Sequence, residues 1–264
     1  MATFNVLHGR TPSDGRVDPQ RLRDALVSLQ ADVVGLQEVD RGQRRSGGLD
    51  LAAEAARYAD GVSHRYVPAL VGTPGAHWRA ATDQDCVAPE DCAEPSYGIA
   101  LLTRLPVLSW HVRRLAPLPV RSPVLVAKRR VMWLSDEPRV MLAAVVEGPL
   151  GAMTVATTHL SFVPGWNGLQ LRRVVASLRE LPAPRILAGD LNLPAPLPRV
   201  ITGWQMLAEL PSYPREEPRV QLDHILGDGA LPAVCAAESQ ALDLSDHRAV
   251  VAELERPSGA VSTS

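Results

Sequence analysis

The segment LAGDLNLP, residues 187–194, decides how this chain is interpreted. It continues the apolar run that begins at RIL and indicates a buried strand, which ends on an aspartate and an asparagine two residues apart. Successive side chains of an extended chain point to opposite faces, so residues i and i+2 share a face. We therefore expect Asp190 and Asn192 to act on one small object just beyond the end of the strand.

Several other apolar segments carry polar residues at or near one end. These residues are Asn5 in TFNVL, Glu38 in VVGLQEV, His159 in MTVATTHL, Asp223 in QLDHIL, and Asp246 and His247 directly before RAVVAEL. Each alone has an ordinary explanation, because Asp-x-Asn is most often a turn or a cap. Their repetition favours a site, since strand ends of one sandwich can meet at a common rim and hold side chains rigidly.

The spacing of apolar residues predicts short strands with interspersed helices. Helices are predicted over 18–30, 48–59 and 167–181, and strands over 3–7, 31–39, 64–71, 97–103, 106–115, 122–134, 138–147, 151–160, 221–226, 233–240 and 249–254, with another ending in the GDLN segment. Residues 72–95 lack periodicity and are predicted to form a long surface loop. Two strand-rich halves without a linker predict one α+β domain over 1–255, with two sheets face to face and helices outside. Residues 256–264 are expected to be a disordered tail.

The first predicted helix has the clearest local signals. Asp18 is the expected N-cap and Pro19 occupies the first helical position, where its missing N–H is not needed. Leu22, Leu26 and Leu29 recur at spacings of four and three, which places them on one helical face.

Composition and charge limit the classes of function. The formal net charge of −2 and the 46% hydrophobic content describe an ordinary globular chain without the basic excess of a protein that grips nucleic acid non-specifically. No membrane-spanning or signal segment is apparent, so a cytoplasmic location and a monomer are the default expectations. Cys86, Cys92 and Cys235 are predicted to be plain thiols, with a Cys86–Cys92 disulfide as the alternative.

Clustered carboxylates at a common rim would repel one another and lose hydration. A divalent cation offsets both costs, and Mg²⁺ prefers carboxylate and amide oxygens. The predicted ligand set is Glu38, Asp246 and the amide oxygen of Asn5, with Mn²⁺ as a substitute for Mg²⁺. Zinc is not expected, since clustered Cys and His ligands are missing from this group of residues.

The remaining polar residues suit hydrolysis of a phosphoester. The Asp190 carboxylate can orient an attacking water, while the neutral Asn192 amide can donate to a substrate oxygen. His247 needs an orienting acceptor, for which Asp223 is the candidate. His159 is expected to serve as a second acid or as a donor to a phosphoryl oxygen.

Seven motifs in order, TFNVLHG, LQEVD, YGIALLTRLPV, THLSF, LAGDLNLP, QLDHIL and LSDHRAVV, resemble those of the endonuclease/exonuclease/phosphatase superfamily. The resemblance covers residues 3–254. It implies a four-layer α/β-sandwich of the DNase-I type, with mostly antiparallel sheets, and Mg²⁺-dependent cleavage of a phosphoester. It also implies the roles given above for the metal-site and catalytic residues. His247 would act as a base or as a contact to the phosphate, backed by Asp223, and His159 as a contact to the phosphate.

One motif departs from the usual pattern. Many members of the superfamily carry Gly-Asn after the aromatic residue, whereas this chain has Gly98-Ile99 after Tyr97. Tyr97 is still counted among the expected catalytic residues through this motif. The departure removes an amide near the expected site and leaves the role of Tyr97 open.

The substrate is not fixed by the superfamily. The absence of a basic excess, the acidic residues of segment 72–95 near the expected rim, and the lack of a membrane anchor slightly favour a small soluble phosphodiester or phosphomonoester. Arg121, Lys128 and Arg130 are candidates for a phosphate-binding wall. The alternatives are a Mg²⁺-dependent DNA or RNA nuclease and a catalytically silent binding or scaffold protein.

Overall fold

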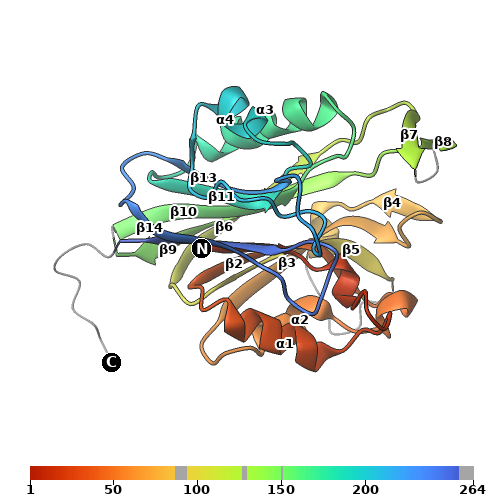
Figure 1. Cartoon of the computed structure of the whole chain (residues 1–264), viewed down its shortest axis with the longest axis horizontal. Coiled ribbons are helices and arrows are strands. Elements are labelled where there is room, and N and C mark those ends of the chain that lie inside the picture. The colour runs from red at the N-terminus through yellow and green to blue at the C-terminus, as the bar shows by residue number, and fades with distance from the viewer. Residues whose placement is uncertain (87–93, 127–129, 150, 256–264) are drawn as a thin grey trace.

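Two β-sheets lie face to face and helices cover both outer faces of the pair, giving four layers (Figure 1). The computed structural model describes residues 1–86, 94–126, 130–149 and 151–255. This arrangement confirms the α+β four-layer sandwich that the sequence predicted.

The first sheet has the strand order β14-β15-β1-β2-β5-β3-β4. Its strands are β1 (Ala2–Asn5), β2 (Val33–Arg41), β3 (Ser63–Gly72), β4 (Trp78–Ala80), β5 (Ser96–Thr103), β14 (Val234–Gln240) and β15 (Ala249–Leu254). Helices α1 (Pro19–Ser28) and α2 (Leu51–Ala56) cover its outer face (Figure 1). The short 3-10 helices η1 (Leu7–Gly9) and η2 (Arg44–Ser46) follow β1 and β2.

The second sheet has the strand order β12-β13-β11-β10-β9-β6. Its strands are β6 (Val107–Leu115), β9 (Arg139–Gly148), β10 (Gly151–His159), β11 (Arg185–Asp190), β12 (Gln205–Met206) and β13 (Asp223–Asp228), and its outer face is covered by α3 (Trp166–Leu178) and α4 (Leu197–Thr202). The pairs β1–β2 and β10–β11 are parallel, and the other pairings of the described strands are antiparallel.

Buried apolar side chains fill each interface between layers. Leu101, Leu142 and Val155 belong to the cluster between the two sheets, and all three are at most 1% exposed. Separate clusters join α1 and α2 to the first sheet and α3 to the second sheet. Burial on both faces of each sheet fixes strand register, because a slip by one residue would turn each strand's apolar set to the wrong side.

Helix α1 begins as its sequence predicts. Asp18 is the N-cap, its Oδ1 accepts the backbone N–H of Gln20 at 2.8 Å, and Pro19 follows at the first position. Asp18→Ala should lower the free energy of unfolding by about 1 kcal/mol, measured by urea denaturation, because it removes this cap. Asp24→Ala, which removes an exposed side-chain contact in the same helix, is the control, and an equal loss in both variants would contradict the cap's contribution.

Two predicted segments are wrong in detail. Segment 72–95 is not a continuous loop, because β4 pairs with the end of β3 and the 3-10 helix η3 (Asp83–Cys86) follows. Segment 122–134 is not one strand but the hairpin β7 (Ser122–Val126) and β8 (Arg130–Leu134). Helix α4 and strand β12 are too short to show a clear period, and the sequence pattern missed both.

Some predictions fall outside the described residues. Residues 87–93, 127–129, 150 and 256–264 are not described, so the predicted tail, Lys128 and the Cys92 side of the alternative disulfide lie outside. Arg130 begins β8, and the description there covers only its backbone.

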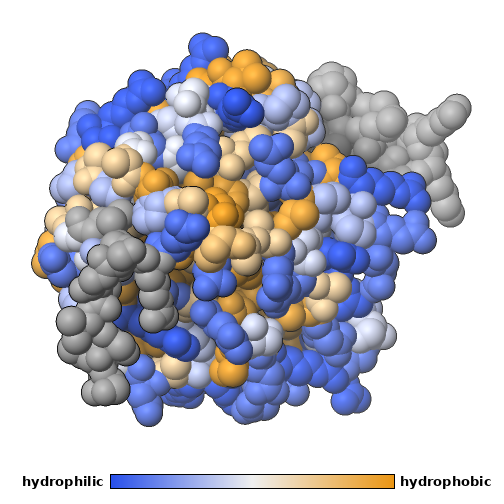
Figure 2. Space-filling model, turned by 60° about the vertical axis from the view of Figure 1, so that its left-hand side comes forward, coloured by the Kyte–Doolittle hydropathy of each residue, from blue (hydrophilic) through white to orange (hydrophobic). Residues whose placement is uncertain are grey.

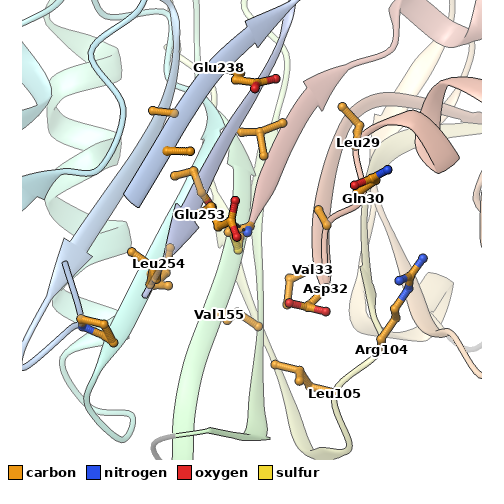
Figure 3. Close-up of a pocket in the computed structure, with 18 of the residues that line it drawn as sticks. Leu29, Gln30, Asp32, Val33, Arg104, Leu105, Val155, Glu238, Glu253 and Leu254 are labelled. Atoms are coloured by element: carbon orange, nitrogen blue, oxygen red, sulfur yellow. Dashed lines mark hydrogen bonds between the residues drawn. The ribbon is translucent and has the colours of Figure 1, made fainter. Parts of the chain in front are cut away.

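The parallel pairs β1–β2 and β10–β11, one in each sheet, end on the same side of the sandwich. Their strand ends meet across the two sheets, as the 3.0 Å contact between Asn5 on β1 and Asp190 on β11 shows. At the opposite end, where β1, β2 and β11 begin, the sheets leave a cavity of about 760 Å³ lined by residues such as Val33 and Glu253 (Figure 3). The face in Figure 2 shows hydrophobic residues near its centre with hydrophilic residues around them.

Candidate active site

Asp190, the last residue of β11, lies at the centre of a polar cluster between the ends of the two sheets. It is 2% exposed, and its Oδ2 lies 3.0 Å from Asn5 Nδ2, 3.5 Å from His159 Nε2 and 3.9 Å from His247 Nε2. Burial and the neighbouring charge of Asp223 raise the pKa of Asp190 to about 7, against the opposing effects of the charge of His247 and of the hydrogen bonds from Asn5 and Asn192. This carboxyl group can therefore exchange a proton near neutral pH.

Asn5 holds two carboxylates together. Its Nδ2 donates to Glu38 Oε1 at 3.1 Å as well as to Asp190, while its Oδ1 accepts the N–H of Leu7 at 3.1 Å. The sequence placed Asn5 among the metal-site residues through its amide oxygen. In this arrangement the oxygen is already bonded to the backbone, and the amide nitrogen faces the carboxylates.

Glu38 has an unusual backbone for a residue in a strand. Its φ is 58°, in the left-handed region, where the pairing of β2 with β5 shifts between Leu36 and Val39. A bulge of this kind redirects a side chain, and strained residues of this kind cluster at functional sites. Burial raises the pKa of Glu38 despite the hydrogen bond from Asn5, so donors of the protein do not fully offset the cost of its charge.

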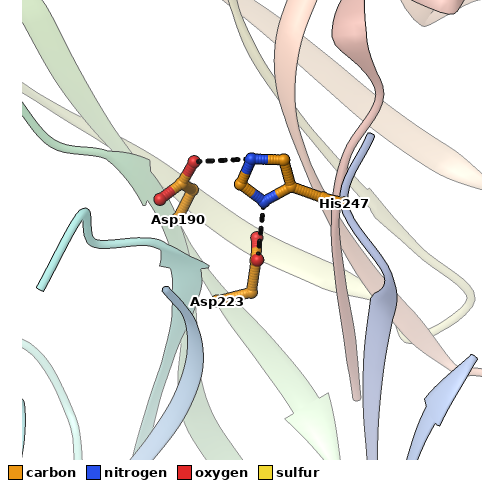
Figure 4. Close-up of side chains that lie close together, drawn as sticks. All are labelled: Asp190, Asp223 and His247. Atoms are coloured by element: carbon orange, nitrogen blue, oxygen red, sulfur yellow. Dashed lines mark hydrogen bonds and ion pairs between the residues drawn. The ribbon is translucent and has the colours of Figure 1, made fainter. Parts of the chain in front are cut away.

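His247 and Asp223 form a tight pair beside Asp190 (Figure 4). His247 Nδ1 lies 2.8 Å from Asp223 Oδ2, and since a carboxylate only accepts, Nδ1 carries the proton. Ser212 Oγ accepts the backbone N–H of Asp223 at 3.1 Å, and the ring of Tyr213 lies 4.8 Å from the imidazole. The pairing that the sequence suggested for these two residues is therefore present in the structure.

The charge state of His247 follows from its neighbours. Burial alone would lower its pKa, but the Asp223 carboxylate, by its charge and its hydrogen bond, and then Asp190 raise it to about 10. A histidine with a raised folded-state pKa contributes stability that is fully present below its unfolded pKa and is lost as the pH rises.

This linkage gives a prediction for the metal-free protein. Wild type should exceed Asp223→Asn in urea midpoint below about pH 6.5, and the difference should shrink as the pH rises toward 10, the window set by the ordinary and raised pKa of His247. Urea titrations at several pH values measure it. A difference that stays constant or grows over this range would show that the pair does not titrate in this way.

Asn192 reaches the site by a route the sequence did not predict. The strand ends at Asp190, and Asn192 has a φ of 48°, so the strand alternation does not extend to it. Instead, its backbone N–H donates to Asp190 Oδ1 at 3.0 Å, which closes a tight turn after the strand. Asparagine tolerates the left-handed backbone that this turn requires. The Nδ2 of Asn192 lies 3.3 Å from His159 Nε2. Asp190 and Asn192 therefore lie beside the same imidazole, but a turn brings them there and not the alternation of a strand.

Tyr97 is buried beside the polar cluster, close enough to Glu38 for that charge to act on it. It is the second residue of β5 and lies opposite Asp40 of β2. Burial, with the charge of Glu38, raises its pKa well above the usual value. Arg45 is held by two hydrogen bonds to the buried Asp40, and its guanidinium carbon lies 5.5 Å from the centre of the Tyr97 ring. The tyrosine hydroxyl therefore stays protonated, and no role beyond this placement follows.

Asp246 is half-buried at the edge of the cluster. Its carboxylate is close enough to raise the pKa of Glu38, and its backbone oxygen accepts the N–H of Arg215 at 2.7 Å. A cation near Glu38 and Asp246 would offset the repulsion between them, and their oxygens are the kind that hard divalent metals prefer. Ligand atoms of Asp190, Asp223 and His247 also lie within 4.8 Å of one another, although His247 there already links the two carboxylates.

The negative charge of the segment before Tyr97 is partly neutralised by ion pairs with arginines. Asp83 lies 3.0 Å from Arg114 Nε, while Asp85 and Glu94 lie 2.8 and 3.1 Å from the same nitrogen of Arg79. These three carboxylates therefore share two arginines, which balance most of their charge. The expectation that they form a lip repelling polyanions loses its support for this described part.

Two residues of this region escaped the sequence analysis or were left undecided. Arg139, buried at the start of β9, lies 3.3 Å from His159 Nδ1. The sequence signal for it was a charged residue in the apolar run between Pro138 and Leu142. Tyr213 stands in the segment PSYPREEPRV before Asp223, a sequence that fits a substrate-contacting loop and an ordinary rim loop equally, and its ring packs on His247.

The strand ends of this two-sheet sandwich bring carboxylates, histidines and amides to one rim, a set of groups that suits the hydrolysis of a phosphoester bond. The chain belongs to the endonuclease/exonuclease/phosphatase family, whose model matches residues 2–247. Members of this family are metal-dependent and cleave phosphoester bonds, and the chain is such an enzyme.

Solved structures share the fold at low sequence identity. An endonuclease/exonuclease/phosphatase from Beutenbergia cavernae is 21% identical, with a TM-score of 0.63 over 95% of this chain and 69% of that one. A mannosyl-6-phosphatase from Bacteroides thetaiotaomicron is 16% identical, with a TM-score of 0.62 over 96% and 98% of the two chains. Sphingomyelinase C from Streptomyces griseocarneus is 19% identical, with a TM-score of 0.56 over the same shares.

The search of curated proteins gave no match. Among the described residues, no helix is both long enough and apolar enough to span a membrane.

Proposed function

We propose that this chain is a Mg²⁺-dependent phosphoesterase that hydrolyses a small, soluble phosphodiester or phosphomonoester by attack of an activated water. The position of Asp190 is the observation that supports this most strongly. One buried carboxylate oxygen lies within 3.0–3.9 Å of an amide and two imidazoles, each from a different strand end or loop.

Asp190 is the base in this proposal. A base works best when its pKa is near the working pH, because it is then both unprotonated and able to hold the proton it accepts. The raised pKa of about 7 meets this condition. Asn5 holds the carboxylate in place through Oδ2, and the backbone of Asn192 does so through Oδ1.

His247 acts as a cation toward the phosphate. The sequence left it as a base or a phosphate contact, and its raised pKa favours the protonated form at neutral pH. Asp223 fixes Nδ1 and leaves Nε2 facing the region of Asp190. An imidazolium there stabilises negative charge that develops on a phosphoryl oxygen.

Glu38 and Asp246 would hold Mg²⁺, with Mn²⁺ as a substitute. When bound, the ion would polarise the phosphoryl group as a Lewis acid and offset its developing charge. The two carboxylates also gain from a cation, because burial makes the charge of Glu38 costly.

A small substrate is favoured by the overall charge of −2, since strong binding to a nucleic-acid backbone depends on a basic surface. Proteins of like fold include one named as a phosphatase and one named as a sphingomyelinase, so both ester types belong in the test.

The test is a panel assayed with Mg²⁺ and with Mn²⁺. It contains p-nitrophenyl phosphate, bis-p-nitrophenyl phosphate and supercoiled plasmid. Turnover of a p-nitrophenyl ester with little nicking supports the proposal. Rapid nicking that falls steeply with added salt would favour the nuclease instead. No turnover of any ester, together with no Mg²⁺ binding by calorimetry, would favour a silent binding protein.

A further inference from the structure

Tyr213 packs directly on His247, the residue proposed as the cation at the phosphate. The centres of the two rings lie 4.8 Å apart, and their planes are tilted by 46°. The side chain of Tyr213 is half-buried, so it belongs to the wall of the site and not to the core. The proposed hydrolysis gives roles to His247 and its partner Asp223 but none to this tyrosine, so its placement calls for an explanation.

The backbone on both sides of Tyr213 is tied to the segment that carries Asp246 and His247. The N–H of Arg215 donates to the backbone oxygen of Asp246 at 2.7 Å, and the N–H of Arg248 donates to the backbone oxygen of Ser212 at 2.8 Å. A group that contacts a substrate has to be held rigidly by its surroundings. These bonds hold Tyr213 in that way.

The Tyr213 hydroxyl lies near two carboxylates. Burial, and then the charges of Asp246 and Asp190, raise its pKa above the usual value, so it stays protonated at neutral pH. It has no hydrogen-bond partner among the residues that the structure describes. A hydroxyl close to two carboxylates would ordinarily donate to one of them. This one donates to neither, so a protonated donor remains free beside the proposed base and a proposed metal ligand.

A donor at this place suits an oxygen of a phosphoryl group. An anionic substrate that approaches Asp190 and Asp246 is repelled by their charge, so it needs donors on the surrounding wall. His247 supplies one through Nε2, which lies 3.9 Å from Asp190 Oδ2. The hydroxyl beside it adds a second donor without adding charge, and a hydrogen bond to an ionised oxygen is roughly twice as strong as one between neutral groups.

We propose that Tyr213 is a substrate-binding residue whose hydroxyl donates a hydrogen bond to the phosphoryl group from the same side as His247. The identity of the acceptor rests on the proposed function. The competing explanation is that the ring only covers His247 and that the hydroxyl contacts solvent. Tyr213→Phe separates the two, because it keeps the ring and removes only the hydroxyl.

The test compares wild type and Tyr213→Phe in the presence of Mg²⁺. Tyr213→Phe should raise the Kd for inorganic phosphate, measured by calorimetry, about tenfold to a hundredfold, the usual effect of losing a hydrogen bond to a charged group. Its kcat/KM on the best ester should fall by a similar factor. The ¹⁵N spectrum of His247 and the thermal melt should stay as in wild type, since the ring contact is kept and the hydroxyl has no protein partner to lose.

Tyr58→Phe is the matched control. The Tyr58 hydroxyl lies 3.5 Å from the backbone oxygen of Ala31, just before the start of β2 and thus at the opposite end of the sandwich. This variant should bind phosphate and hydrolyse the ester as wild type does.

Three results would overturn the role of Tyr213 while the proposed function stands. They are unchanged phosphate affinity and kcat/KM in Tyr213→Phe, equal losses in Tyr58→Phe, and a loss in Tyr213→Phe that comes with an altered His247 spectrum, which would assign the effect to a displaced histidine. If wild type hydrolyses no ester of the panel, the proposed function fails, and the role of Tyr213 fails with it.

Discussion

Asp190→Asn should abolish most turnover, with kcat falling by about 10²–10⁴ on the best substrate of the panel. The substitution keeps the size of the side chain and removes its ability to take a proton from water. Burial already makes the charged form of Asp190 unfavourable, so the neutral amide should not cost much stability. Steady-state kinetics with Mg²⁺ and a thermal melt measure both effects.

The control for this variant must also remove a buried polar contact without touching the site. Thr154→Val serves as this control. Thr154 is buried in the first half of β10, away from the strand end that carries His159, and its hydroxyl donates to the backbone oxygen of Pro182 at 2.7 Å. Its kcat should match wild type. If Asp190→Asn keeps more than a tenth of wild-type kcat while folded, Asp190 is not the base.

The second large effect is expected for Asp223→Asn, with kcat lowered by about 10³–10⁴, as for other histidines that lose an orienting carboxylate. The amide neither compensates the imidazolium charge nor specifies which ring nitrogen is protonated. His247 should then be neutral at pH 7, because the largest effects that raise its pKa come from Asp223. Kinetics and the ¹⁵N spectrum of His247 report the two consequences.

Glu238→Gln, an exposed carboxylate on β14, is the control for charge. It should leave both kcat and the His247 spectrum unchanged. A folded Asp223→Asn protein with nearly wild-type kcat and a protonated His247 would refute the importance of this pair, and with it the assignment of His247 as the cation at the phosphate.

Local sequence patterns predicted most elements but not their arrangement. The cap at Asp18 and the apolar face from Leu22 to Leu29 determine α1 by short-range chemistry, and the structure has this helix over Pro19–Ser28. The order of strands within each sheet depends on long-range pairing, which local periodicity does not contain. The four-layer arrangement came from the family resemblance, and very short elements such as β12 form only because a neighbouring strand pairs with them.

The site shows a similar division. Asp190, Asp223 and His247 were predicted to come together, and the structure brings them into contact because β11 and β13 pair with these two aspartates opposite each other. Asn192 was placed by strand alternation, which its left-handed backbone breaks. The contact of Arg139 with His159 could not be predicted, because the two residues lie 20 positions apart in sequence on the neighbouring strands β9 and β10.

The metal dependence of phosphoester hydrolysis tests the central claim most directly. Purified wild type and Asp190→Asn are assayed on bis-p-nitrophenyl phosphate and p-nitrophenyl phosphate after chelation with EDTA and again after addition of Mg²⁺. The account predicts turnover by wild type that EDTA removes and Mg²⁺ restores, with almost none from Asp190→Asn in either condition. Turnover that persists in EDTA, or equal rates for the two proteins with Mg²⁺, would contradict it.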